Sequence, residues 1–582
     1  MCGIFGVNAK YSVIAPILDG LTKLEYRGYD SSGIAVIDEN KEIKTIRSKG
    51  KLFNLKKKID KIKISGKIGI GHTRWATHGV PSTTNAHPHT SDNVSIVHNG
   101  IIENYSSLKK ELQKKGYNFK SQTDSEVIAH LLSSELKKNN AEVAIKMTLS
   151  KLEGAFAIAI IFKDLSLLAG ARKGSPLAVG VSDDATFIGS DSVALAPFTK
   201  KIIFLEEGDS VFIQDKALKI YNEKFNEVKR QITYSSYTKD NLDKGNFNHF
   251  MQKEIFEQPH VIGDSLSRFV EPIHKIINIP ELKINWKKIS KINFIACGTS
   301  FFACQVASYW FEKIVGISCS SHFASEFRYK PIVEKSSNIL SIFISQSGET
   351  ADTLAALRFA KKNKSKILSL VNVTESSIAR ESDYVVSIAA GPEIGVASTK
   401  AFSAQLSVLA CICLVMAREK KKITKKKEFE LTESLLEVPS NMSSILELCK
   451  KINEISKKIV NAKSALFLGR GISFPIAMEG ALKLKEISYI HAEGYASGEM
   501  KHGPIALVDD KVPVIIIAPK DFLFEKNVSN MQEIMARGGD VILITDKNGE
   551  KKLDEETLKK IVLSNVNEFV QPILYRSEEH TS

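Results

Sequence analysis

Long apolar segments are absent from this 582-residue chain. Its longest apolar run, Leu406 to Ala417, falls well short of the ~20 residues that a membrane-spanning helix needs, so we expect a buried helix and no membrane partner. No basic segment followed by an apolar one opens the chain, so we expect no signal peptide. The seven cysteines are scattered, which argues against a disulfide framework and favours a reducing, cytoplasmic location.

Ligand-binding motifs are missing as well. No Cys/His group has zinc spacing, so we expect no metal. Neither G-x-G-x-x-G nor G-x-x-x-x-G-K-[ST] occurs, which argues against a nucleotide fold. The net charge of +14 admits either a nucleic-acid binder or a lysine-rich surface. The densest basic run, Arg418 to Lys427, holds no aromatic residue and no nucleic-acid motif accompanies it, so we expect no nucleic-acid partner.

What is present is a globular composition, with 43% hydrophobic and 25% charged residues. One core rarely serves more than ~250–300 residues, so we expect several domains. The first part shows short β-type runs separated by Gly, Asn and Asp turns. A polar stretch follows, and after it apolar strands alternate with longer helical patterns, which is typical of a parallel α/β sheet. We therefore predict a first domain over 1–236, a linker over 237–248, and two further domains over 249–430 and 431–582.

An internal repeat supports the last two domains. Residues 294–301 (FIACGTSF) are similar to residues 467–474 (FLGRGISF), and matching their glycines gives an offset of 173 residues. The same offset takes the apolar strand ending at Ile344 to the one ending at Ile517, and it relates a third pair of strands. The pattern indicates two copies of one α/β unit, each of ordinary domain size.

The chain opens with Met1-Cys2-Gly3, and a residue as small as cysteine allows removal of Met1. Cys2 would then be the N-terminal residue, with an α-amino group whose pKa of ~7.7–8.0 lies close to the ~8.5 of a thiol. The amine could take the thiol proton directly or through a water, which makes Cys2 a candidate nucleophile. The alternative is a small buried cysteine in the first strand.

Four motifs within the first 130 residues favour the nucleophile. They are residues 24–33 (LEYRGYDSSG), 71–79 (GHTRWATHG), 98–100 (HNG) and 123–126 (TDSE). Taken singly, His78 or Arg27 could equally be structural. Together with Cys2 the motifs resemble the glutaminase half of class II (N-terminal-nucleophile) amidotransferases, which implies a four-layer αββα fold.

The motif residues have suitable chemistry. A guanidinium such as Arg74 can clamp the α-carboxylate of glutamine, and Asp124 can pair with its α-ammonium. An Asn side chain and a backbone N–H, here of Asn99 and Gly100, can form an oxyanion hole. The resemblance assigns these roles to the four residues. It also places Thr77 and His78 in the glutamine pocket and makes Trp75 the gate of an internal ammonia channel.

Two hydroxyl-rich turns follow strands of the first repeat. Hydroxyls and free N–H groups at the start of a helix form an anion site, although simple helix capping would use the same residues. The turns and the repeat resemble sugar isomerase (SIS) domains, which hold sugar phosphates in this way. A third stretch, residues 395–402 (GVASTKAF), matches that family's sugar pocket. The candidate sugar-phosphate residues are Thr299, Ser300, Ser345, Gln346, Ser347, Thr350, Val396 and Ser398.

The second repeat supplies candidate acid–base groups. Glu479, Lys483 and Glu486 stand at i, i+4 and i+7, which places them on one helix face, where an exposed salt-bridged surface is the alternative. The resemblance makes Lys483 a sugar-site residue and Glu486 the group that moves protons between C1 and C2. His502 resembles the ring-opening histidine, which reaches the sugar from a neighbouring subunit, so a homodimer is expected.

A glutaminase followed by tandem SIS domains implies an enzyme without a cofactor. It would take L-glutamine and D-fructose 6-phosphate and form D-glucosamine 6-phosphate and L-glutamate. The family ends in a tail whose lysine forms a Schiff base with the ketose, whereas residues 576–582 (RSEEHTS) look like a foreign read-through. We therefore expect glutaminase chemistry but poor sugar amination. A sugar-phosphate sensor with an inert first domain, and an amidotransferase for another ketose phosphate, remain alternatives.

Overall fold

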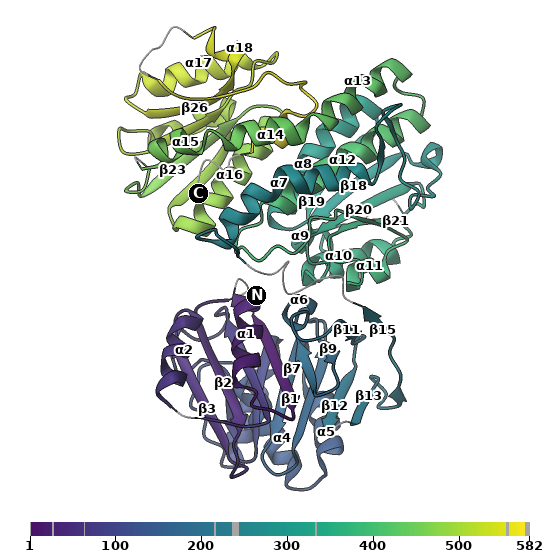
Figure 1. Ribbon diagram of the computed structural model, residues 1–582, viewed down its shortest axis with the longest axis vertical. Helices are drawn as coiled ribbons and strands as arrows, with labels where there is room; N and C mark the ends of the chain where they lie inside the picture. Colours follow the sequence, from purple (N-terminus) through teal and green to yellow (C-terminus); the bar gives the residue numbers. More distant parts are fainter. Residues whose placement is uncertain are drawn as a thin grey trace. The chain divides into compact units, whose positions relative to one another are not determined.

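The computed structural model describes residues 2–25, 28–62, 64–214, 217–234, 244–331, 335–457, 459–553 and 558–576. The chain divides into two compact units, Met1–Asp243 and Lys244–Ser582 (Figure 1). Four features of the sequence lie wholly or largely outside the described residues. They are Met1, Arg27, most of the predicted linker and the last six residues.

The first unit contains two antiparallel sheets. The first has the order β15 (Ile232–Tyr234), β11 (Lys201–Phe204), β9 (Ala178–Val181), β10 (Ala185–Gly189), β1 (Gly3–Ala9), β4 (Ile68–Arg74), β2 (Ser31–Ile37), β3 (Ile43–Lys49). The second has the order β14 (Glu227–Val228), β13 (Ala217–Tyr221), β12 (Ser210–Gln214), β8 (Leu167–Lys173), β7 (Gly154–Phe162), β6 (Val94–Ile102), β5 (His89–Ser91).

Helices cover the outer face of each sheet. They are α1 (Ile14–Leu24), α2 (Leu52–Lys61) and α6 (Ser192–Leu195) on the first sheet, and α3 (Tyr105–Lys114), α4 (Glu126–Leu136) and α5 (Ala141–Lys151) on the second. Alternation along β1 shows the layering, because Phe5 packs with the helices while Ile4 packs between the sheets. Three separate apolar cores follow, and the predicted four-layer αββα fold is confirmed.

The second unit holds two five-stranded parallel sheets of identical strand order. The first is β19 (Ser318–Phe323), β18 (Lys291–Ala296), β20 (Ile339–Ser345), β21 (Lys366–Val371), β22 (Tyr384–Ser387). The second is β24 (His491–Ala496), β23 (Ser464–Gly469), β25 (Pro513–Ile517), β26 (Asp540–Asp546), β27 (Lys559–Leu563). In each sheet the strand that comes first in the chain, β18 or β23, lies between the second and the third. The fourth and fifth strands then follow the third in chain order. The predicted repeat is therefore confirmed.

Helices surround both sheets of this unit (Figure 1). The longer ones are α7 (Phe250–Ser267), α8 (Gly298–Trp310), α10 (Ala351–Lys362), α12 (Lys400–Glu419), α13 (Lys425–Leu436), α14 (Val438–Leu446), α15 (Cys449–Ser456), α16 (Ser473–Ser488) and α17 (Phe524–Met535). The shorter elements are β16 (Val270–Glu271), β17 (Ile276–Ile277), η3 (Trp286–Lys288), η4 (Phe311–Val315), α9 (Ala324–Phe327), α11 (Ser377–Glu381), η5 (Ser497–His502), η6 (Pro504–Leu507), α18 (Lys547–Glu550) and α19 (Gln571–Leu574).

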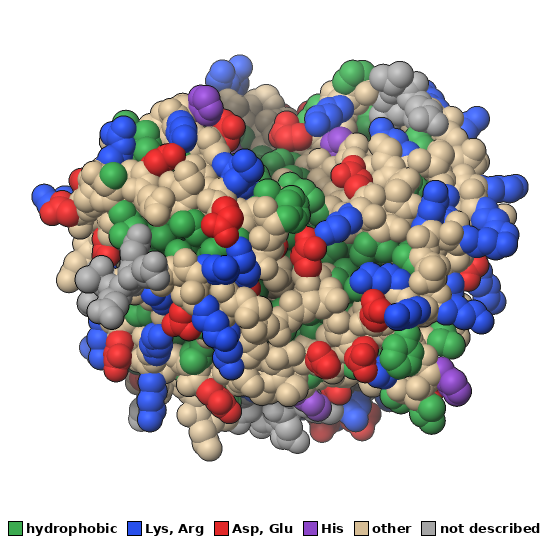
Figure 2. Space-filling view, turned by 90° about the horizontal axis from the view of Figure 1, so that it is seen from above, with side chains coloured by type: hydrophobic (Ala, Val, Ile, Leu, Met, Phe, Trp, Pro, Cys, Tyr) green, Lys and Arg blue, Asp and Glu red, His purple; other side chains and the backbone are tan. Residues whose placement is uncertain are grey.

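The long apolar run lies in α12, as predicted for a buried helix. Among the described residues this is the one helix long and apolar enough to span a membrane, and its apolar window is 100% buried inside the protein. It packs against α7 and α8 in the core that the two repeats share. The basic run after it is mostly exposed, and Figure 2 shows Lys and Arg scattered among Asp and Glu on one face.

Candidate active sites

The first candidate site surrounds Cys2, which comes directly before β1. Gly3 is paired with Thr73 of the neighbouring β4, and this register brings Cys2 beside the residues that follow Thr73. The Cys2 thiol lies 3.4 Å from the carbonyl oxygen of Trp75, and the Trp75 N–H donates to the same sulfur at 3.3 Å. From the facing sheet, the Asn99 amide Nδ2 donates to the Cys2 carbonyl at 3.0 Å. Cys2 is partly exposed, unlike the buried cysteine of the alternative interpretation.

Arg74 is 3% exposed and has one end of its guanidinium occupied. Its Nη2 donates to the carbonyls of His78 and Gly79, which fixes the loop after β4. Its Nη1 is buried and has no hydrogen-bond partner among the described residues. Burial lowers the pKa of Arg74, while Cys2, Asp30 and Asp124 act in the opposite direction. A buried N–H group aimed at no protein acceptor can receive a carboxylate.

Asp124 and Gly100 are held by backbone geometry. The Asp124 carboxylate is 3% exposed and accepts from the Ile102 N–H at 2.8 Å. Gly100 has φ +128°, and a Cβ there would lie 2.0 Å from the Ala155 carbonyl oxygen, so only glycine fits. Its position beside Asn99 is therefore fixed by the pairing of β6 with β7.

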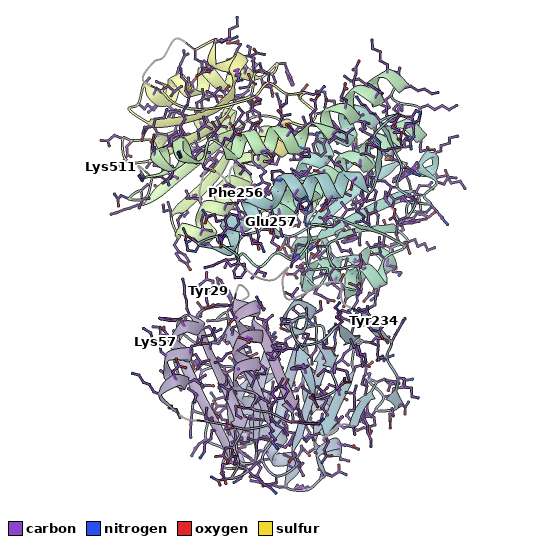
Figure 3. All side chains as sticks on the ribbon, viewed as in Figure 1. Tyr29, Lys57, Tyr234, Phe256, Glu257 and Lys511 are labelled. Carbon is purple, nitrogen blue, oxygen red and sulfur yellow. The ribbon has the colours of Figure 1, made fainter. Side chains whose placement is uncertain are left out.

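The remaining glutaminase candidates lie on the loop after Arg74. Trp75 is 44% exposed, and its ring meets that of Tyr29 edge-on with ring centroids 5.6 Å apart; Tyr29 is labelled in Figure 3. Thr77 is exposed, and His78 is half-buried with its ring edge on Tyr105. The backbone of His78 also holds this loop, because its carbonyl accepts from Arg74 Nη2.

The second candidate site begins at the two hydroxyl turns of the first repeat. Ser345 Oγ accepts from the Gly348 N–H at 3.0 Å and lies 3.1 Å from Thr350 Oγ1. The Ser347 hydroxyl accepts from the Glu349 N–H at 3.2 Å, whereas Gln346 is partly exposed. The turn requires glycine at 348, where φ is +65° and a Cβ would lie 1.9 Å from a serine hydroxyl.

Simple capping does not account for these hydroxyls. Thr350 is the N-cap of α10, yet its side chain makes no capping hydrogen bond. On α8, Thr299 Oγ1 accepts from Lys483 Nζ at 2.9 Å, and Ser300 Oγ accepts from Gln405 at 3.0 Å. Gln405, on α12, was not predicted from the sequence, because no local motif marks it.

The second repeat contributes the face of α16 that carries Glu479, Lys483 and Glu486. Lys483 Nζ lies 2.7 Å from Glu486 Oε2 and 3.4 Å from Glu479 Oε1. The side chains of Glu479 and Lys483 are 0% exposed and that of Glu486 is 33% exposed. The exposed salt-bridged surface that spacing alone suggested is therefore wrong. Since Lys483 also bonds Thr299, the two repeats meet at one polar cluster.

A buried pair of carboxylates shapes the loop that carries Val396 and Ser398. Glu254 of α7 accepts from the Gly395 N–H at 2.9 Å. Glu393 accepts from the Ser398 hydroxyl at 2.9 Å and from the Thr399 N–H at 2.8 Å. Val396 itself is 49% exposed, so its side chain is available to a ligand.

The same loop is tied to α7 a second time. Lys400 Nζ is 2.7 Å from Glu257 Oε2, and Figure 3 shows Glu257 on that helix. Burial raises the pKa of Glu254 to about 8, with the charge of Glu393 as the next cause. Sequence analysis missed Glu254 and Glu257, because α7 lies far from the loop in the chain.

The second repeat has no matching hydroxyl turn. The offset of 173 residues carries residues 345–350 (SQSGET) to 518–523 (APKDFL) and Thr299 to Ile472. The equivalent position is a cavity of about 340 Å³ with Ile472, Phe522 and Leu523 in its wall. The second repeat therefore keeps a hydroxyl at Ser473, the counterpart of Ser300, and lacks those at the counterparts of 299, 345, 347 and 350.

His502 stands apart from the other predicted sugar residues. It ends η5 and is exposed. Among the described residues, no hydrogen bond or ion pair joins it to Thr299, Lys483 or Glu486. Within one chain the structure thus joins Thr299, Lys483 and Glu486 in one cluster and places the two hydroxyl turns after the paired strands β18 and β20, but it does not bring this histidine to them.

Known proteins resemble this chain over nearly its whole length. Residues 72–197 match the glutamine amidotransferase domain, and residues 286–414 and 458–575 match the SIS domain. A glutamine–fructose-6-phosphate aminotransferase [isomerizing] of Bartonella quintana is 49% identical over 99% of this chain and 95% of its own length. A protein of the same name from Mesorhizobium japonicum is 50% identical with the same coverage.

A solved structure agrees with these relatives. It is the C-terminal domain of glucosamine-fructose-6-phosphate aminotransferase from Francisella tularensis. This domain is 41% identical to our chain, with a TM-score of 0.56, and the match covers 58% of our chain and 95% of that domain.

Proposed function

This chain belongs to the family of isomerizing glutamine–fructose-6-phosphate aminotransferases, and from that premise we propose which residues carry out each step. The family reaction moves the amide nitrogen of L-glutamine to D-fructose 6-phosphate and yields D-glucosamine 6-phosphate and L-glutamate. The observation that carries our assignment is the partly exposed Cys2 thiol held beside Asn99 and Arg74.

Glutamine binds with its α-carboxylate on Arg74 and its α-ammonium near Asp124, with Thr77 and His78 beside it. The Cys2 thiol gives its proton to the α-amino group of Cys2 itself, which removal of Met1 leaves at the N-terminus. The sulfur then attacks the side-chain amide carbon of glutamine. Asn99 Nδ2 and the Gly100 N–H stabilise the resulting oxyanion. The Cys2 ammonium gives this proton to the amide nitrogen, the carbon–nitrogen bond breaks and ammonia leaves. Water then hydrolyses the thioester, which releases glutamate and restores the Cys2 thiol. Trp75, which brackets the thiol through its backbone, is proposed to gate the departure of ammonia.

The sugar phosphate binds at the hydroxyl turns of the first repeat. Its phosphate is held by Ser345, Ser347 and Thr350, where the N-terminal N–H groups of α10 add favourable dipoles. Further binding residues are Thr299, Ser300, Gln346, Val396 and Ser398. Glu486 transfers the proton between C1 and C2 of the sugar. Lys483 orients the Glu486 carboxylate, with its Nζ 2.7 Å from Glu486 Oε2.

Two further proposals concern the assembly. His502 is exposed and lies apart from the cluster of its own chain, which supports a role in a neighbouring copy. A homodimer would then complete each sugar site. We also propose a cytoplasmic location, because seven cysteines scattered along the chain fit a reducing compartment.

An isotope-transfer experiment tests the glutaminase assignment. The chain is incubated with fructose 6-phosphate and glutamine labelled with ¹⁵N in the side-chain amide, and glutamate release and labelled amino sugar are measured by mass spectrometry. Cys2→Ala should lower glutamate release by at least about 10³-fold, because the nucleophile is lost. Cys449→Ala, which alters a cysteine outside both sites, is the matched control. Undiminished glutamate release by Cys2→Ala would refute the assignment.

A further inference from the structure

His72 occupies a buried position behind the proposed oxyanion hole. It lies on β4, two residues before Arg74, and its side chain is 0% exposed between the two sheets. Its Nε2 is 3.0 Å from the Asn99 Oδ1 and 3.0 Å from the His98 carbonyl oxygen. We propose that His72 is a positioning residue that orients the Asn99 side-chain amide so that its N–H₂ group faces Cys2. The inference rests on the proposed glutaminase function of Cys2 and Asn99.

The two contacts at Nε2 determine the tautomer. A backbone carbonyl can only accept a hydrogen bond, so the contact with His98 requires a hydrogen on Nε2 of His72. The atom of Asn99 that shares this hydrogen must then be an acceptor, which is the amide oxygen. Without the His98 carbonyl, a flipped amide facing an unprotonated Nε2 would fit equally well. The carbonyl therefore removes the ambiguity that an Asn side chain otherwise has.

The surroundings keep the His72 ring neutral and immobile. Burial lowers the pKa of His72 to about 3, and the hydrogen bond that His72 donates to Asn99 opposes this shift only in part. The ring packs on His87 with centroids 4.2 Å apart. Its Nδ1 is buried without a hydrogen-bond partner among the described residues, which fits an unprotonated nitrogen. A fixed neutral ring with hydrogen on Nε2 always presents a donor to Asn99, and this donor holds the amide in one orientation.

The orientation of the amide matters for catalysis. With Oδ1 held by His72, Nδ2 points at Cys2 and donates to its carbonyl at 3.0 Å. A flipped amide would set N–H₂ against the N–H of His72 and turn an oxygen toward the developing oxyanion. Preorganised donors cost no reorganisation during the reaction, so a wrongly turned amide loses stabilisation of the transition state.

Two substitutions at His72 distinguish positioning from packing. The amide nitrogen of glutamine stands the same number of bonds from Cα as Nε2 of histidine, whereas that of asparagine is one bond short. His72→Gln should therefore keep a donor for Asn99, and His72→Asn should lose it. His130 is the matched control, because it is a histidine only 7% exposed whose ring bonds Ser91 rather than Asn99. His130→Asn removes a comparable ring elsewhere in the same domain.

The assay compares binding in the ground state and near the transition state. Glutamate γ-semialdehyde adds the Cys2 thiol to its aldehyde carbon and forms a tetrahedral adduct, whereas L-glutamate binds without reaction. We expect His72→Asn to lower kcat for glutamate release by about 10- to 100-fold with KM within about threefold. The inhibition constant of the aldehyde should rise by a similar factor and that of glutamate should not. His72→Gln should recover most of both losses, and His130→Asn should resemble the unsubstituted chain.

Several outcomes would overturn the inference. Equal losses in His72→Gln and His72→Asn, or equal weakening of aldehyde and glutamate binding, would show a packing role. If His72→Asn does not fold, ¹⁵N NMR of the histidines in the unsubstituted chain shows which ring nitrogen of His72 carries the hydrogen. The signal of His72 is identified as the one that disappears in His72→Gln. A hydrogen on Nδ1 rather than Nε2 refutes the positioning argument. Absence of glutamate release by the unsubstituted chain would instead refute the proposed function, and the tautomer would still be measurable.

Discussion

Lys483→Met is expected to destabilise the second unit strongly. The substitution removes an ammonium that is 0% exposed and lies 3.4 Å from a carboxylate of Glu479 that is also 0% exposed. Losing one partner of a buried ion pair costs about 3–5 kcal/mol, because the remaining charge stays out of water. At about 2–4 °C per kcal/mol for domains of this size, the Tm should fall by roughly 6–20 °C. Differential scanning calorimetry measures this directly.

A double variant separates stability from binding. Lys483→Met combined with Glu479→Gln removes both charges, and we expect at least half of the lost stability to return. Binding of fructose 6-phosphate, measured by calorimetric titration, should not return, because Thr299 still lacks its partner. Lys501→Met, at a salt bridge with a lysine side chain 58% exposed, is the control and should shift the Tm by less than about 2 °C. A Tm for Lys483→Met within 2 °C of the parent, or full sugar binding by the double variant, would refute the reasoning.

Other substitutions test the remaining parts of both sites. Burial holds the pKa of Glu254 at about 8 against an ordinary 4.5, so the folded state keeps a proton that the unfolded chain releases, and stability falls as pH rises between these values. Glu254→Gln should flatten that slope in thermal unfolding at several pH values, and an unchanged slope would contradict the burial argument. Gly348→Ala places a Cβ 1.9 Å from the Ser376 hydroxyl at φ +65°, so it should cost more than about 1 kcal/mol in chemical denaturation, whereas Gly116→Ala at φ +88° meets no neighbour and should cost less. Arg74→Lys should raise the KM for glutamine about 10- to 100-fold in a glutamate-release assay, since a lysine ammonium cannot hold the loop carbonyls as Nη2 does and also present a second nitrogen to the carboxylate as Nη1 does, and an unchanged KM would remove Arg74 from the pocket.

Sequence patterns were sufficient for the architecture. Alternation in the first half and the 173-residue repeat in the second predicted the layers that the structure contains. Both signals are local, because each depends on residues within one strand or on a comparison of one stretch with another. The hydroxyl turns were found for the same reason, since each lies at the end of an apolar strand.

Contacts between distant segments could not be predicted in this way. Spacing placed Lys483 on a helix face but could not tell that the face is buried against Thr299 of the other repeat. Glu254 bonds to Gly395, in the loop that carries Val396 and Ser398, from 141 residues away in the sequence, and no sequence motif marks Glu254. His72 stood within a recognised motif, yet its role depends on a carbonyl and an amide in the facing sheet.

The different hydroxyls of the two repeats have a consequence for how this chain can change. In an assembly of two identical single-repeat chains, every substitution would appear twice, once on each side of the twofold axis. Joining the copies in one polypeptide frees each side from the other. Position 299 can therefore keep its hydroxyl while position 472, its counterpart, becomes isoleucine, and α16 can carry the ion pairs of Lys483 with Glu479 and Glu486 that α8 lacks. Tandem duplication thus turns a symmetric pair of partial sites into one asymmetric and more specialised site.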